Sequence, residues 1–205
     1  MTFVHQDAEF SQLVQIVARS TGIAAALIEK DYWVTHTLWA IHQTGLDIWF
    51  KGGTSLSKGF GLIQRFSEDL DLMVERGTVG GLPAVTSWTS TNRGPLAKRR
   101  AFYDALAAAL VVPNVAVEQD ATRIDKRARG ADYLARYPGA LLAEFGPAMS
   151  PFVRLEVGRA RVVPHVQRSL TSFVHNHLEE QGLLAEFVDN RPVGVRCVHP
   201  MVTLF

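Results

Sequence analysis

Apolar residues recur at intervals of three and four along the first part of the chain, which is the spacing of one buried face of an α-helix. This spacing predicts a first helix over Phe10–Ala18 and a second over Ile23–Ile41. The second helix is expected to end before Gly45, because glycine readily adopts the left-handed conformation that terminates helices. Two helices therefore precede the rest of the fold.

A strand and a short helix are predicted next. The segment Leu46–Phe50 is short, aromatic and apolar, as strands are, and the pair Gly52-Gly53 ends it. Thr54 or Ser55 is expected to cap a helix that runs to about Phe60, because a hydroxyl oxygen can accept a hydrogen bond from the free N–H groups of a first helical turn.

An alternation of polar and apolar residues then predicts a strand from Asp69 to Val74, with Asp69 and Asp71 on one face. The segment from Gly77 to Pro95 has no clear period and is rich in Gly, Thr, Ser and Pro, so we expect a long loop there. Beyond it the patterns predict a helix over Leu96–Leu110, strands over Val115–Val117, Tyr133–Tyr137 and Phe152–Val157, a helix over Ser169–Gln181 and a last strand over Val193–Val198.

This order of elements predicts an α+β fold with a small mixed sheet flanked by helices. The chain has 205 residues, of which 47% are hydrophobic, which is enough to bury the core of one domain. We expect the helices of residues 1–45 to pack on a core formed by residues 46–205.

Cysteine usage and the distribution of apolar residues indicate the compartment. Cys197 is the only cysteine, which excludes an intrachain disulfide and suits a reducing environment. Residues 1–10 lack the basic and then apolar order of a secretory signal, and no uninterrupted apolar stretch approaches the length that crosses a bilayer. We therefore expect a cytoplasmic protein that is not bound to a membrane.

Positive charge gathers in the middle of the chain, although the formal net charge is only +1. Residues 93–168 contain thirteen Lys and Arg against seven Asp and Glu. Such a stretch attracts a polyanion such as nucleic acid or a triphosphate, although a solvated helix face has the same composition. The cationic residues that stand out are Lys98, Arg99, Arg100, Arg123, Lys126, Arg127 and Arg129.

The glycine pair and the aspartate pair together predict a site for a metal-bound nucleotide. Glycine lets the backbone approach a phosphate closely, and the N–H groups that open the next helix, with the hydroxyls of Thr54 and Ser55, are suited to donate to its oxygens. Asp69 and Asp71 point to the same side of a strand and suit Mg²⁺ or Mn²⁺, which in phosphoryl transfer bridge the oxygens of a triphosphate.

Each part of this pattern also has an ordinary structural interpretation. A glycine pair alone is usually a turn, and Asp-x-Asp alone is usually a solvated strand end, so their joint occurrence carries the prediction. The run is not a P-loop, because Gly53 is not followed after four residues by Gly-Lys-Ser/Thr. Lys58 is a candidate phosphate contact or a surface lysine, and Arg65 is a candidate triphosphate contact or a brace for Asp69. Trp88 is the one tryptophan that we suspect of stacking on a base.

The sequence KGGTSLSK at residues 51–58, followed by RFSEDLDL at 65–72, resembles the nucleotidyltransferase superfamily that includes DNA polymerase β. It is more closely similar to the AbiEii/AbiGii toxin family of bacterial abortive-infection and type IV toxin–antitoxin systems. The resemblance covers most of the chain. Ile28–Trp33 looks like the family's N-terminal helix, and Val153–Val157 lies where the third metal carboxylate of the fold is expected.

This resemblance implies a polymerase β-like fold and the transfer of a nucleoside monophosphate from an NTP to an RNA acceptor such as a tRNA, by a phage-defence toxin with a cognate antitoxin. It implies that Asp69, Asp71 and Glu156 are catalytic and bind the metal, with Glu156 as third ligand or general base. For Glu156, an edge position or a pair with Arg154 is the alternative. The expected nucleotide contacts are Gly52, Gly53, Thr54, Ser55, Lys58, Arg65 and Ser67.

The family pattern continues past the last residues of this chain, His199–Phe205, into a helical region with a lysine and an Arg-Asp motif that complete the active site. The chain given ends before that region, so we expect it to bind NTP·Mg²⁺ and to turn over poorly on its own. A non-catalytic nucleotide-binding module and an enzyme that modifies Ser, Thr or Tyr of a protein are the alternative functions.

Overall fold

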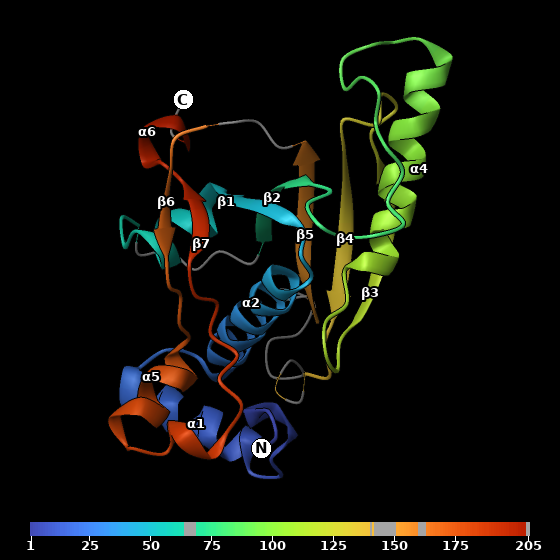
Figure 1. Cartoon of the computed structure of the whole chain (residues 1–205). Coiled ribbons are helices and arrows are strands. Elements are labelled where there is room, and N and C mark those ends of the chain that lie inside the picture. Colours follow the sequence, from blue (N-terminus) through green and yellow to red (C-terminus); the bar gives the residue numbers. More distant parts are fainter. Residues whose placement is uncertain (64–68, 140, 142–150, 160–162, 204–205) are drawn as a thin grey trace.

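A mixed sheet forms the centre of the computed structural model, which describes residues 1–63, 69–139, 141, 151–159 and 163–203 (Figure 1). Among these residues the sheet has seven strands in the order β3-β4-β5-β2-β1-β7-β6. Strand β2 runs parallel to β5 and β1 runs parallel to β7, whereas the other neighbours are antiparallel. The strands are β1 (Asp47–Lys51), β2 (Asp69–Glu75), β3 (Ala116–Ile124), β4 (Gly130–Arg136), β5 (Phe152–Arg159), β6 (His165–Arg168) and β7 (Val195–Val198).

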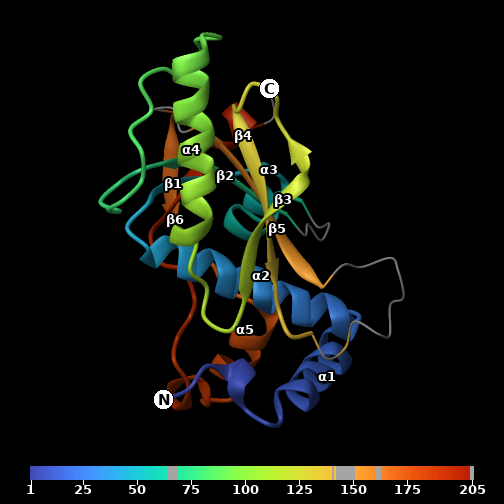
Figure 2. The ribbon, with the colours of Figure 1, turned by 90° about the vertical axis from the view of Figure 1, so that its right-hand side faces the viewer.

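Two long helices cover one face of this sheet. Helix α2 contacts β2 and β5, and α4 lies along β3 and β4 (Figure 2). The residues of the strands that face the helices, such as Leu72, Leu155 and Tyr133, are fully buried or nearly so. Helices α1 and α5 pack together and against α2 at the end of the molecule that holds the N-terminus (Figure 1). The helices are α1 (Phe10–Thr21), α2 (Ala25–Gln43), α3 (Gly52–Thr54), α4 (Arg93–Ala109), α5 (Phe173–Glu180) and α6 (Pro200–Thr203).

Helix α2 is buried on almost all sides, including its charged residues. The run Ile28–Trp33 contains Glu29, Lys30 and Asp31, each of which is at most 5% exposed. A charge is buried at acceptable free energy only when it has partners. Asp31 forms an ion pair with Lys58, and Glu29 accepts a hydrogen bond of 3.2 Å from the backbone N–H of Leu141. The charged residues of this run therefore connect α2 to distant segments.

The prediction of an α+β fold with a mixed sheet is confirmed, and several element boundaries differ from the expected ones. The last long helix begins at Phe173 and not at Ser169, because the hydroxyl of Ser172 accepts from the backbone N–H of His175 and caps it. Strand β6 was not predicted: it has four residues, mostly exposed, and owes its conformation to pairing with β7. Strand β3 is longer than predicted, because pairing with β4 extends it into polar sequence.

Trp88 is half-buried and packs against α4, and its stacking on a base stays a prediction. Its ring centroid lies 5.5 Å from that of Phe102 and 6.0 Å from that of Tyr103, both in edge-on contacts with α4. Such aromatic pairs stabilise a core. Trp88 therefore anchors the segment before α4 to the helix.

A membrane-spanning helix has to be long and apolar. Within the described part of the chain no single helix is long and apolar enough to cross a bilayer. Helices α1 and α2 reach that length and composition only as a pair, and they are bent by 113° with respect to each other.

Candidate active site

Carboxylates from three neighbouring strands lie in one row across the sheet. Strand β5 runs between β2 and β4, and Glu156 pairs in register with Asp71 on one side and with Asp132 on the other. Their side chains share the face opposite α2, because the alternate residues of the same strands are buried in the core. Asp69 lies two residues before Asp71 on the same face. We call Asp69, Asp71, Asp132 and Glu156 the acidic row.

Burial and mutual repulsion disfavour the charged form of Glu156. Its pKa is raised above the usual value, first by burial and then by the negative charges of Asp71, Asp132 and Asp69. Arg123 opposes this shift, with Nη1 at 3.4 Å from a carboxylate oxygen of both Glu156 and Asp132. Because the Arg123 side chain is 55% exposed, water screens much of its effect. A further cation would therefore stabilise the acidic row.

Gly52 brings the backbone of the turn after β1 against the carboxylate of Asp71. Its φ is +75°, a left-handed conformation that glycine adopts without strain. A Cβ atom at this position would lie 1.8 Å from Asp71 Oδ2, far inside van der Waals contact. The other carboxylate oxygen, Oδ1, lies 3.5 Å from Lys51 Nζ. Asp71 is thus held between the glycine turn and a lysine.

Thr54 and Ser55 direct their hydroxyls into the protein. Thr54 is 1% exposed, and its Oγ1 donates a hydrogen bond of 2.5 Å to the backbone carbonyl of Asp69. Ser55 is fully buried beside Cys197, whose thiol pKa is raised chiefly by burial. Neither residue is the cap that the sequence suggested, because the left-handed Gly52 starts the helix earlier and Lys51 is its N-cap. Their contact with a nucleotide stays a prediction, and in this conformation both side chains are buried.

Comparison with known proteins assigns the family. Residues 38–203 match the family model described as "Nucleotidyl transferase AbiEii toxin, Type IV TA system". The chain belongs to this family. Among solved structures it is similar to MenT4, a nucleotidyltransferase toxin from Mycobacterium tuberculosis H37Rv, with a TM-score of 0.51 and 20% sequence identity over 91% of this chain and 55% of MenT4. At that identity the likeness shows the fold, and the chain spans about half the length of MenT4. No curated protein matches the chain.

The donor set of the acidic row fits the hard divalent cation that AbiEii membership implies. Mg²⁺ prefers oxygen ligands, and each side chain of the row offers carboxylate oxygens. Within the described residues, no three His, Cys, Asp or Glu side chains converge closely enough to hold an ion. Lys51 and Arg123 stand at the carboxylates. Binding of a metal ion would therefore require side chains of the acidic row to rotate and the side chains of Lys51 and Arg123 to move away from the carboxylates.

The remaining predicted nucleotide contacts of this AbiEii domain fall into two groups. Lys58 is 14% exposed and forms the ion pair with Asp31 of α2, so it connects the helix after the glycine turn to the core. Asp31 also accepts a hydrogen bond of 3.0 Å from the backbone N–H of Phe173. Arg65 and Ser67 lie outside the described residues. The lysine that the structure places at the acidic row is Lys51, at Asp71.

Arg154 is bound to other acids than Glu156 in the described part of the chain. Its Nη1 lies 2.7 Å from Asp120 Oδ2 and 3.5 Å from Asp132 Oδ2. Hydrogen bonds from the Thr122 side chain and from Arg154 lower the pKa of Asp120 to about 2. The alternative that Glu156 serves as the partner of Arg154 is therefore wrong. Arg154 instead connects β5 to β3 and positions Asp132 beside Glu156.

Asp132 is the member of the acidic row that sequence reasoning missed. The predicted strand began at Tyr133, so Asp132 fell in the preceding segment, whereas β4 begins at Gly130. A one-residue extension of the alternating pattern would have placed it on the face opposite Tyr133. Its neighbour Arg123 was noted only as a charge, because the pairing of β3 with β4 joins residues without a local signal.

Proposed function

We propose that this AbiEii-family chain transfers a nucleoside monophosphate from an NTP to an acceptor. Asp69 and Asp71 hold Mg²⁺, or Mn²⁺, and Glu156 is the third ligand or the general base. The observation that carries the proposal is the register that sets Asp71 beside Glu156 while Gly52 lies against the Asp71 carboxylate. This arrangement unites the two halves of the sequence motif in one place.

Each part of the site has a role in this reaction. The turn at Gly52 and Gly53 lets the triphosphate approach the carboxylates, because no side chain of Gly52 fills that space. Mg²⁺ held by Asp69 and Asp71 would supply positive charge that offsets the charge of the leaving pyrophosphate. Glu156, with its raised pKa, is suited to take the proton of an acceptor hydroxyl. Lys51 supplies positive charge at the edge of the site.

The acceptor in this proposal is an RNA such as a tRNA, and the chain acts in the cytoplasm as the toxin of an abortive-infection pair that a cognate antitoxin controls. The family description and the basic middle of the chain support it. A protein acceptor is the second candidate, because a Ser, Thr or Tyr hydroxyl has the same chemistry. A non-catalytic nucleotide-binding module is the third, since the chain spans 55% of MenT4.

The acceptor is tested by incubating the protein with each of the four NTPs labelled at the α-phosphate, in the presence of Mg²⁺. One set of reactions contains total RNA, and a matched set contains an RNA-free protein extract. We expect label in RNA, no label in protein, and no transfer when EDTA removes the metal.

The other outcomes separate the alternatives. Label in protein alone would replace the RNA acceptor by a protein acceptor. Calorimetric binding of NTP·Mg²⁺ without transfer to either acceptor would support the non-catalytic module. Transfer to RNA that is unaffected by EDTA would reject the metal role of the acidic row.

A further inference from the structure

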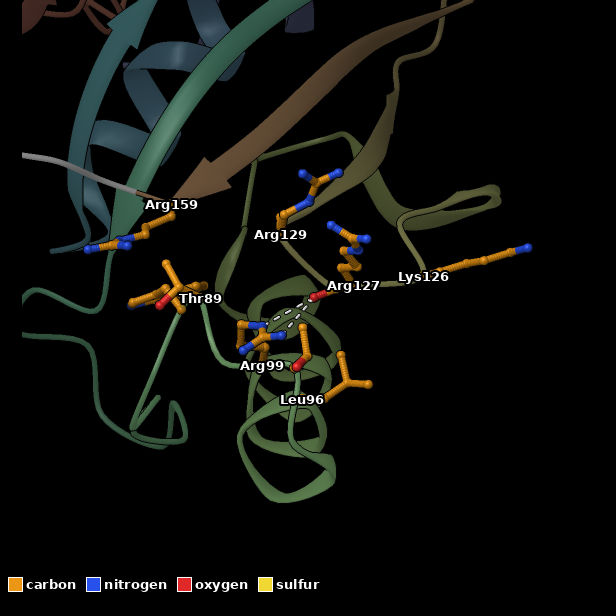
Figure 3. A pocket seen from close by; sticks show the side chains of 9 residues that line it. Thr89, Leu96, Arg99, Lys126, Arg127, Arg129 and Arg159 are labelled. Atoms are coloured by element: carbon orange, nitrogen blue, oxygen red, sulfur yellow. Dashed lines mark hydrogen bonds between the residues drawn. The ribbon is translucent and has the colours of Figure 1, made fainter.

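A pocket of about 480 Å³ opens beside α4 (Figure 3). Among the described residues, five cationic ones line it and no acidic one does. They come from α4, from the turn between β3 and β4, and from the end of β5. We call this site the cationic pocket; its cations are Arg99, Lys126, Arg127, Arg129 and Arg159.

Arg99 builds the wall of the cationic pocket. It is 2% exposed, and its Nη1 donates to the carbonyls of Ser87 at 2.7 Å and Ser90 at 3.0 Å. Its Nε and Nη2 both donate to the carbonyl of Arg127, at 3.2 and 2.9 Å (Figure 3). These four hydrogen bonds fix the segment before α4 and the β3–β4 turn to the helix, so the pocket is preformed.

The other cations are exposed, and one of them is paired with an acid. Arg129 forms an ion pair of 3.1 Å with Asp125. Arg127, Lys126 and Arg159 are exposed, and within the described residues their side chains have no carboxylate partner. Positive charges gathered without anions repel one another, and a polyanion that binds there relieves the repulsion. The cationic pocket is therefore suited to an anion from outside the chain.

The acidic row and the cationic pocket use opposite faces of the same two strands, β4 and β5. Arg159 follows Glu156 by three residues on β5, and Arg129, in the turn just before the antiparallel β4, precedes Asp132 by three residues. At about 3.3 Å per residue, each of these arginines begins roughly 10 Å along the strand from its acid. Because an odd spacing directs the side chains to opposite faces of the sheet, an elongated ligand with one end at the acidic row reaches the cationic pocket by passing round the start of β4 and the end of β5.

The spacing and the absence of acids favour a phosphodiester chain over a second NTP. An NTP binds as a complex with Mg²⁺, and its sites provide carboxylates for the metal. The described part of the chain contributes no carboxylate to the lining of the cationic pocket. RNA carries one charge on each successive phosphate, which matches cations spread over α4, the β3–β4 turn and the end of β5.

We propose that the cationic pocket binds the phosphodiester backbone of RNA, upstream of the end that lies at the acidic row. The link to the acidic row rests on the proposed function, whereas RNA binding itself does not. Arg127 and Arg159 contact phosphates. Arg99 acts only by holding the pocket open.

The test measures the affinity of the protein for a fluorescently labelled single-stranded RNA by anisotropy at several salt concentrations. Arg127→Gln and Arg159→Gln, singly and combined, are compared with Arg19→Gln, an exposed arginine on α1 at the opposite end of the molecule. We expect a loss of about fivefold for each single variant and at least about twentyfold for the double variant. The slope of log K against log salt should fall by roughly 0.7 for each lost phosphate contact.

Arg19→Gln should bind like the wild type, and all variants should keep the wild-type melting temperature because the changed side chains are exposed. Unchanged affinity and slope in the double variant would overturn the proposal, as would a wild type that binds no RNA. Transfer of α-label into RNA is scored separately. If RNA binds through the pocket but no label is transferred to it, the proposed acceptor is wrong and the RNA-binding role of the pocket stands. If the double substitution changes neither binding nor transfer, only the role of the pocket is wrong.

Discussion

Gly52 shows how a single residue sets the geometry of the proposed active site. The sequence indicated a glycine turn for phosphate binding, and the structure adds that the first glycine is required by Asp71 itself. The contact between Gly52 and Asp71 can be tested directly, because a side chain at position 52 would meet the Asp71 carboxylate.

We predict that Gly52→Ala lowers the affinity for NTP·Mg²⁺ more than tenfold, because the new Cβ displaces the Asp71 carboxylate. Isothermal calorimetry gives the affinity, and thermal unfolding reports stability. Gly22→Ala is the matched control, since Gly22 has a φ of +72° with no atom within 4 Å of the new Cβ. It carries the same backbone strain without the clash, so equal affinities of the two variants would contradict the role of Gly52.

Thr54 gives a second prediction for a single residue. Thr54→Val keeps the shape of the side chain and leaves the buried carbonyl of Asp69 without its hydroxyl donor. We expect the free energy of unfolding to fall by about 1–3 kcal/mol in urea denaturation. Thr54→Ser restores the hydroxyl and should recover most of that loss. A Thr54→Val variant as stable as the wild type would show that the hydrogen bond does not position the strand.

At the level of elements, helix α2 is held by a buried polar network that its apolar pattern did not reveal. His36 is fully buried, and its Nε2 lies 2.9 Å from the carbonyl of Pro113, to which it donates. Its Nδ1 accepts from the side-chain amide of Asn190 at 2.8 Å. Burial is the main cause that lowers the pKa of His36 to about 4. Both ring nitrogens are thus engaged in the neutral form.

This network predicts a dependence of stability on pH. The folded pKa of about 4 lies below the usual value of 6.5, so the unfolded chain binds the proton more readily and stability is lost as the pH falls from 6.5 towards 4. Between pH 7.5 and pH 5 the loss from His36 is on the order of 2 kcal/mol. Urea denaturation at both values measures it. His36→Gln should show a clearly smaller loss, and the exposed His165→Gln should keep the full loss; equal losses in all three proteins would refute the assignment.

Local pattern predicted those elements whose burial is periodic. The alternation of β2 is reproduced residue by residue, because every second residue faces α2 and the core. The pattern failed where pairing with a distant strand decides the conformation, as in the exposed β6 and in the polar half of β3. It also placed the helix after β1 too late, since a left-handed glycine begins that helix before any hydroxyl cap.

At the level of the whole molecule, the candidate site is a product of strand order. Sequence alternation put Asp69 and Asp71 on one face, but Glu156 joined them only through the resemblance to the family. The structure supplies the physical reason, which is the parallel pairing of β2 with β5. Contacts between segments distant in sequence produce the position of Asp132 in the site, the ion pairs of Arg154 and the cationic pocket. No local sequence pattern predicts these features.

The central claim is that the acidic row drives the transfer of a nucleoside monophosphate with release of pyrophosphate. The most direct measurement follows the label from NTP labelled separately at the α- and γ-phosphates, with RNA as acceptor. The wild type is compared with Asp71→Asn and with the control Asp104→Asn, which changes an exposed aspartate of α4. The account predicts α-label in RNA and γ-label in pyrophosphate. Asp71→Asn should reduce the transfer by about a hundredfold or more, while Asp104→Asn leaves it unchanged. Transfer of the γ-label to RNA, or undiminished transfer by Asp71→Asn, would contradict the account.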